Sequence, residues 1–143
     1  MMRRVSVLLV FALTASLLSS AEETLEQLKA RAKAAHGGDQ VKLFLEVANR
    51  ELKLANEAFE AGDIEKGHAT VEDVVTYAER AGDSARSSGK HLKKTEIEVR
   101  RIANRLDDIG RALSLDDRAP LQAAVKRLEY VRTQLLARMF GEK

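Results

Sequence analysis

An apolar side chain or a threonine recurs every three or four positions throughout residues 92–113. In an α-helix this spacing places the side chains on one stripe, and a steady alternation of three and four is the heptad seam along which coiled-coil helices pack. The stripe comprises Leu92, Thr95, Val99, Ile102, Leu106, Ile109 and Leu113. A second stripe, in residues 121–135, comprises Leu121, Ala124, Leu128, Val131 and Leu135. Both segments therefore predict long helices that bury one face against other helices.

Start and stop signals for helices occur before these two segments. The TLEQ capping box at residues 24–27 predicts the start of a short first helix, and Gly37 and Gly38 predict its end. Asp39 is predicted to cap a second helix over residues 39–61, and the Gly62-Asp63 turn is predicted to start a third. We expect the third helix to break or kink near residues 87–90, where two serines precede a glycine, although a continuous helix is the alternative.

The start of the last helix is predicted from three residues. Asp116 or Asp117 is expected to act as its N-cap, and Pro120 is then expected in its first turn, where the missing amide hydrogen costs nothing. With one proline in the chain and good helix formers throughout, nothing reads as a strand. The sequence predicts an all-α fold: an up-and-down antiparallel bundle of four long helices, a short N-terminal helix lying across it, and a signal-peptide helix before it.

The first residues carry the pattern of a secretory signal. Two arginines precede an apolar run over residues 5–18, and small residues follow at Ser19 and Ala21. We therefore predict a signal peptide over residues 1–21, cleavage between Ala21 and Glu22, and a single helical-bundle domain over residues 22–143. The alternative is an uncleaved membrane anchor, but a run of 14 residues rises only about 21 Å against a hydrocarbon core of about 30 Å. The expected location is periplasmic or extracellular.

Charge and cysteine content exclude several classes of protein. The chain has 24 Lys and Arg against 22 Asp and Glu, and loss of Arg3 and Arg4 with the leader leaves a neutral chain, so a nucleic-acid partner is not expected. The absence of cysteine excludes disulfides, thiolate chemistry and a lipid-modified cysteine. Residues 22–89 carry a net charge of −5 and residues 90–143 a net charge of +5. We expect these two halves to attract each other within the chain.

A cluster of basic residues on the fourth predicted helix is the candidate interaction surface. Its members are Lys93, Lys94, Arg100, Arg101 and Arg105, which could meet phosphates or anionic lipid head groups. The alternative is a solvated face whose charge is already paired. The pairs at helical contact spacing are Lys94 with Glu98, Glu96 with Arg100, Glu98 with Arg101, and Arg105 with Asp108.

No catalytic or metal-binding constellation stands out. His36, His68 and His91 each lack a second histidine three or four residues away, and His68 is expected to be a partly buried packing residue. The adjacent acidic pairs have capping or ion-pair explanations, and motifs for serine nucleophiles, phosphate-binding loops and zinc proteases are missing. We therefore expect no enzymatic activity, no cofactor and no metal.

The stretch AFEAGDIEKGH, residues 58–68, resembles the turn of a tetratricopeptide helical hairpin. With Gly62 aligned to the turn glycine of that repeat, Leu54, Ala55 and Gly67 also fit the pattern over residues 51–79. The positions for its tryptophan, tyrosine, phenylalanine and proline hold other residues, and no second copy occurs about 34 residues away. The resemblance implies a peptide-docking hairpin; an ordinary αα-hairpin is the alternative. Residues 88–109 and 116–136 also resemble exported bacterial helical proteins with no assigned activity.

Two functions follow from these patterns. The first is a non-enzymatic exported interaction or scaffold module that binds a protein partner or pairs with itself through the heptad seams; contact with a membrane is expected only through an uncleaved leader. The alternative is a periplasmic sensor of ligands, metals or envelope stress. It would require a cavity lined by His68 or Tyr77, or a basic strip from Lys93 to Arg105 that its acidic neighbours leave open.

Overall fold

The computed structural model describes residues 23–141, which form five helices and no strand. The helices are α1 (Leu25–Ala34), α2 (Gly37–Glu60), α3 (Ile64–Ser88), α4 (Leu92–Arg111) and α5 (Leu115–Met139). The prediction of an all-α fold is confirmed. None of these helices combines the length and the apolar character needed to cross a membrane. The expected signal peptide over residues 1–21 and its cleavage site between Ala21 and Glu22 lie outside the described residues.

The connection between α1 and α2 differs from the prediction. The capping box at the start of α1 forms, because Thr24 Oγ1 accepts from the Gln27 amide at 3.2 Å and Gln27 Oε1 accepts from the Thr24 amide at 3.0 Å. However, α2 starts at Gly37, with His36 rather than Asp39 as its N-cap. Asp39 lies in the first turn, where a carboxylate is also favourable because of the helix dipole. Gly37 takes a φ of 56°, a left-handed conformation that turns the chain between the two helices.

The boundaries of α3 agree with the sequence. Asp63 caps its start by accepting from the Lys66 amide at 3.2 Å, and the turn before it joins α2 and α3 into a hairpin. The helix ends at Ser88, and Gly89 and His91 follow with φ values of 70° and 56°. A break near residues 87–90 is therefore confirmed, and the continuous helix is excluded.

The start of α5 lies earlier than predicted. Ser114 is the N-cap and accepts from the Asp117 amide at 3.3 Å, so neither Asp116 nor Asp117 is the cap. Pro120 consequently lies in the second turn of the helix rather than in the first. The misplaced start has a simple cause: Leu115 is 78% exposed, so the first turn of α5 adds nothing to the apolar stripe.

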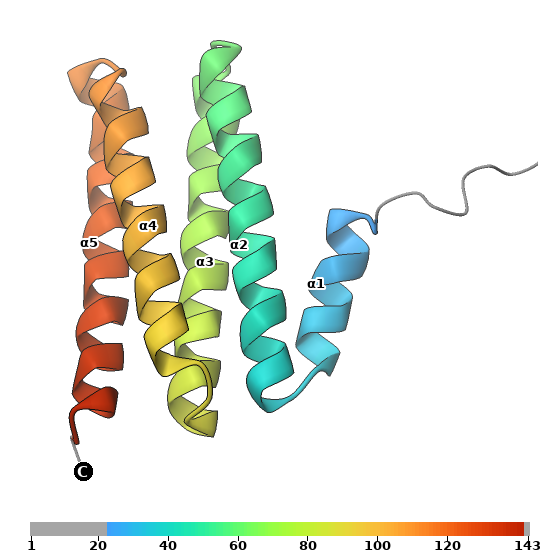
Figure 1. Cartoon of the computed structure of the whole chain (residues 1–143). Coiled ribbons are helices and arrows are strands. Elements are labelled where there is room, and N and C mark those ends of the chain that lie inside the picture. Colours follow the sequence, from blue (N-terminus) through green and yellow to red (C-terminus); the bar gives the residue numbers. More distant parts are fainter. Residues whose placement is uncertain (1–22, 142–143) are drawn as a thin grey trace, which may run out of the picture.

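Two helical hairpins lie side by side in the molecule (Figure 1), one made of α2 and α3 and the other of α4 and α5. Successive helices run in opposite directions, so α2 and α4 run the same way, as do α3 and α5. Between the hairpins, α3 packs against α5 and α4, and α2 packs against α4. The Cα atoms of α2 and α5 nowhere come within 8 Å, so these two helices lie diagonally opposite each other, whereas the predicted up-and-down order would place them side by side. The short α1 packs alongside α2 instead of lying across the longer helices.

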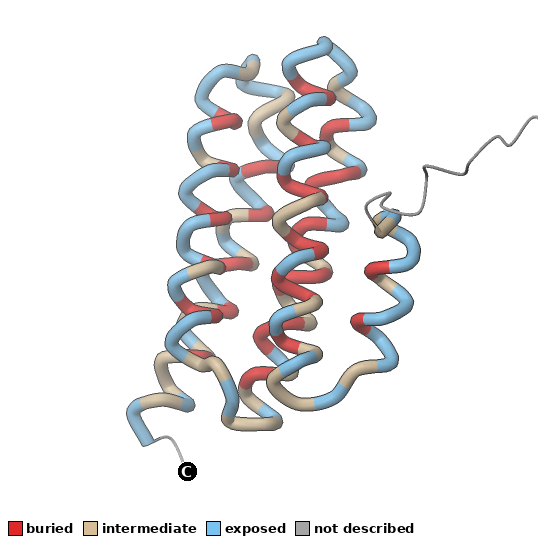
Figure 2. The backbone as a smooth tube through the Cα atoms, turned by 45° about the vertical axis from the view of Figure 1, so that its right-hand side comes forward, coloured by how far each residue is buried: buried red, intermediate tan, exposed pale blue. Residues whose placement is uncertain are grey.

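One hydrophobic core contains residues from all five helices. Figure 2 shows the buried residues on the inner sides of the helices, with exposed residues facing outward. Both heptad seams are buried in this core: Val99, Ile102 and Leu106 on α4 and Leu121 and Leu128 on α5 are almost completely inaccessible. The seams are thus already used within the chain.

Ion pairs also join the acidic hairpin to the basic one. Arg127 of α5 lies 2.7 Å from Glu72 Oε1 and 2.6 Å from Glu79 Oε1, both on α3. Hydrogen bonds to these two carboxylates raise the pKa of the Arg127 guanidinium. The expected attraction between the two halves of the chain is confirmed at this contact.

A candidate binding groove between α2 and α4

A groove runs along the shallow contact between α2 and α4. It consists of two hollows of about 430 and 410 Å³, both of which reach Asn49 and Lys53, so the two are continuous along α2. We call this surface the basic groove and define it by its polar lining. From α2 come Lys42, Glu46, Asn49, Arg50, Lys53 and Asn56, and from α4 come Lys94, Glu98, Arg101 and Arg105.

Helical spacing explains why these side chains face one another. On α2, Lys42, Asn49 and Lys53 are separated by seven and four residues, and on α4 the lining residues follow one another at intervals of four, three and four. Such intervals keep side chains on one side of a helix. The nearly buried Leu45 and Leu52 lie at the base of the groove. Long polar side chains rather than aliphatic ones therefore occupy the outer part of the contact between α2 and α4.

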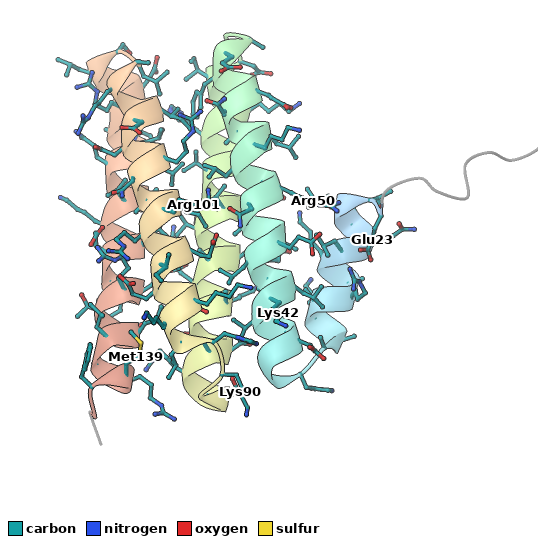
Figure 3. The ribbon with its side chains drawn as sticks, viewed as in Figure 1. Glu23, Lys42, Arg50, Lys90, Arg101 and Met139 are labelled. Carbon is teal, nitrogen blue, oxygen red and sulfur yellow. The ribbon has the colours of Figure 1, made fainter. Side chains whose placement is uncertain are left out.

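A hydrogen-bonded cluster crosses the groove at its middle. Asn49 Nδ2 donates to Glu98 Oε2 at 3.4 Å, while Arg101 Nη2 donates to the same Glu98 oxygen at 2.9 Å and to Asn49 Oδ1. We call Asn49, Glu98 and Arg101 the α2–α4 bridge; Figure 3 labels Arg101, its member on α4. Partial burial raises the pKa of the Glu98 carboxyl, but the hydrogen bonds from Arg101 and Asn49 outweigh this effect, so the pKa is lowered overall.

Four cations of the groove have no carboxylate partner. Within residues 23–141, Lys42, Lys53, Lys94 and Arg105 make no ion pair shorter than 4.0 Å. The other two, Arg50 and Arg101, lie 3.3 Å from Glu46 and 2.9 Å from Glu98. The groove therefore carries positive charge that the fold itself does not neutralise.

The four ion pairs predicted along α4 form only in part. Glu96 with Arg100 and Glu98 with Arg101 are present, at 3.5 and 2.9 Å. The other two, Lys94 with Glu98 and Arg105 with Asp108, do not come within 4.0 Å. The basic strip is consequently more open than its spacing indicated.

The structure divides the predicted interaction surface into two parts. Lys94, Arg101 and Arg105 line the basic groove, whereas Lys93 and Arg100 do not. Arg100 instead pairs with Glu96, a buried carboxylate that Arg132 of α5 also binds, at 3.0 Å. That side of α4 belongs to the contact between α4 and α5.

Sequence reasoning missed the contribution of α2 to the groove. Lys42 and Lys53 lie in the half of the chain with a net charge of −5, so the overall charge of that half concealed them. Their separation of 11 residues is close to three helical turns. This spacing of two lysines on a polar helix face is the sequence signal that could have identified them.

The histidines lie in structural positions. His68 packs edge-on against Phe59, with 5.6 Å between the ring centroids, and its Nε2 lies 2.7 Å from the carbonyl oxygen of Asp117. Because a carbonyl can only accept, Nε2 carries the proton in this bond, which joins α3 to α5. His36 and His91 are the N-cap residues of α2 and α4. Among residues 23–141, no group of three or more His, Cys, Asp or Glu is placed to hold a metal ion.

Tyr77 takes part in packing rather than lining the basic groove. Its ring is 7% exposed and lies 6.1 Å from the ring of Phe44. The Lys29 ammonium and the Arg80 guanidinium lie 5.3 and 5.0 Å from the centroid of the ring. Two cations and an aromatic ring thus surround Tyr77.

No family model, curated protein or solved structure significantly matches this chain. The chemistry of the groove is therefore the basis for assigning a function. Its ammonium and guanidinium groups can bind carboxylates or phosphates through charge-assisted hydrogen bonds.

Proposed function

We propose that this chain is a non-enzymatic helical interaction module that binds an acidic segment of a partner protein along the basic groove. The observation that carries the proposal is the set of four cations, Lys42, Lys53, Lys94 and Arg105, that have no acidic partner in the described part of the chain. In keeping with the pattern of its first residues, we propose that the module acts after export, as one domain over residues 22–143.

Electrostatics supports a partner of opposite charge. Like charges gathered on two facing helices repel one another, and a bound carboxylate would replace this repulsion with attraction. Because the groups are exposed, salt would screen the attraction, and binding should weaken as the ionic strength rises.

The test measures binding of fluorescently labelled poly-L-glutamate by anisotropy, at 20 and 200 mM salt. We expect binding that weakens at the higher salt concentration, and that weakens at both concentrations in the Lys94→Gln variant. Lys93→Gln is the matched control, because Lys93 is the neighbouring exposed cation on α4 but does not line the groove. Equal binding by the wild type and Lys94→Gln would place the interaction elsewhere.

The unpaired cations of the basic groove also support a second candidate, a sensor of an anionic lipid or small anion. Two further measurements separate it from the first proposal: binding to phosphatidylglycerol vesicles and to inorganic phosphate. Vesicle or phosphate binding that is lost in Lys94→Gln, without binding to poly-L-glutamate, would favour the sensor.

A further inference from the structure

We infer that the basic groove recognises two separated acidic groups on one extended segment of the partner, a conclusion that rests on the proposed function above. The four unpaired cations lie in two sets at opposite ends of the groove. Lys42 and Lys94 line the first hollow, whereas Arg105 lines the second, together with Lys53, which reaches both. The α2–α4 bridge lies between the two sets.

The two sets are equally far apart on both helices. Lys42 and Lys53 are 11 residues apart on α2, and Lys94 and Arg105 are 11 residues apart on α4. At 1.5 Å per residue this separation is about 16.5 Å, and 11 residues complete three turns to within about 20°. The helices α2 and α4 run in the same direction (Figure 1). Because Asn49 bonds to both Glu98 and Arg101, the two spacings lie side by side along the groove.

The middle of the groove disfavours an acidic group. Arg101 is already bound to Glu98 and Asn49, and the Glu98 carboxylate would repel a second carboxylate placed beside it. The free cations at each end would attract one. The groove therefore favours acidic groups about 16.5 Å apart over the same groups placed together, because both ends are then engaged by one ligand.

An extended polypeptide covers this distance in about five residues, at about 3.3 Å per residue. The inferred ligand is thus an extended segment with acidic residues centred five positions apart. A nucleic acid or a lipid surface presents its phosphates without such a gap, so a preference for spacing distinguishes the inferred partner from both.

The test compares two peptides of identical composition and charge, EESGSEE and SGEEEES, by titration calorimetry with the whole protein at 20 mM salt. The glutamate pairs of the first are centred five positions apart, and those of the second are adjacent. We expect EESGSEE to bind at least about fivefold more tightly, since only this peptide engages both ends. Lys42→Gln and Arg105→Gln should each remove this advantage, whereas Lys93→Gln should retain it. Circular dichroism melting confirms that each variant is folded.

The outcomes separate this inference from the proposed function. Equal affinity for the two peptides, with both weakened by Lys94→Gln, would overturn two-point recognition and leave acidic binding in place. Absence of binding to either peptide would overturn both. If both Lys42→Gln and Arg105→Gln still preferred EESGSEE, the two acidic groups would not bind at the ends of the basic groove. Light scattering tests whether a second copy of the chain occupies the groove instead. A dimer mass for the wild type and a monomer mass for Lys94→Gln would show this, and would contradict the inference.

Discussion

Lys29 of α1 and Glu51 of α2 form an ion pair between a partly buried ammonium and a buried carboxylate, with 2.9 Å between Nζ and Oε1. The Glu51 residue is 3% exposed, and the same ammonium lies over the ring of Tyr77 on α3. Burial alone would lower the pKa of Lys29, but the hydrogen bond to Glu51 and the negative charges nearby, that of Glu51 foremost, together outweigh it, so the pKa is raised. The pair adds to the few contacts that hold α1, which buries only Leu28 and Ala32 completely.

Replacing Lys29 should therefore loosen α1. We expect Lys29→Ala to lower the free energy of unfolding by about 2–4 kcal/mol, because it leaves the Glu51 carboxylate buried without its partner. Lys33→Ala, on the same helix at an exposed position, should change it by less than about 0.5 kcal/mol. Urea denaturation measures both values, and hydrogen exchange should show the loss of protection concentrated in α1. Equal effects of the two substitutions would contradict this role of the pair.

Acid should weaken the α2–α4 bridge through Glu98. The pKa of Glu98 is lowered in the folded chain, so its contribution to stability is present above the unfolded value of about 4.3 and is lost as pH falls through the lower folded value. We expect the wild type to be more stable than Glu98→Gln at pH 7 and the difference to shrink progressively as the pH falls below about 4.3. Urea denaturation across this pH range checks the prediction; a difference independent of pH would refute the electrostatic cause.

Two buried glycines should respond in opposite directions to alanine. A Cβ at Gly82 would lie 2.7 Å from Cγ1 of Val131, at the contact between α3 and α5, and a β-branched side chain in a helix has little freedom to move away. Gly82→Ala should therefore lower stability by about 1–3 kcal/mol. A Cβ at Gly110 would meet its neighbours at 3.5 Å, an ordinary contact. Gly110→Ala should raise stability by about 0.5–1 kcal/mol through helix propensity, and thermal melting of both variants is the measurement.

Arg118 should stabilise the end of α4. Its guanidinium donates to the carbonyl oxygens of Gly110 at 3.0 Å, Leu113 at 3.1 Å and Arg111 at 3.3 Å, at the end of the helix where carbonyl groups run out of intrahelical amide partners. We expect Arg118→Ala to cost about 1–2 kcal/mol in urea denaturation. Arg111→Ala removes only an exposed pair with Asp107 and should cost less than about 0.5 kcal/mol. Similar losses in the two variants would show that the carbonyl contacts contribute little.

The helices could be predicted from the sequence because their cause is local. The seam on α4, the capping box at Thr24 and the Gly89 break depend on neighbours within one or two turns, and all three occur in the structure. The errors arose where a second local signal competed with the first. Asp39 and Asp117 are good caps by type, but each lies in the first turn of a helix that starts earlier, where an acidic residue is equally favourable.

The candidate site was only half predictable, since it depends on how two distant helices are aligned. The α4 members could be identified from their charge, but their pairing could not, because Lys94 and Arg105 lie within helical reach of acidic residues that they do not bind. The α2 members become part of the site only when Asn49 meets Glu98 and Arg101, 49 and 52 residues further along the chain. No spacing within one helix contains that information.

The stacking of the two hairpins, with α4 beside α2 and α5 beside α3, has a consequence for how such a molecule could grow. In an up-and-down bundle the last helix packs against the first, so a further helix must break that contact to continue the order. Here the α4–α5 hairpin ends a row, and its far side has no fifth long helix against it within the described chain. Duplication of a single hairpin could lengthen the row, and the ligand-facing surface with it, without rebuilding what is already there.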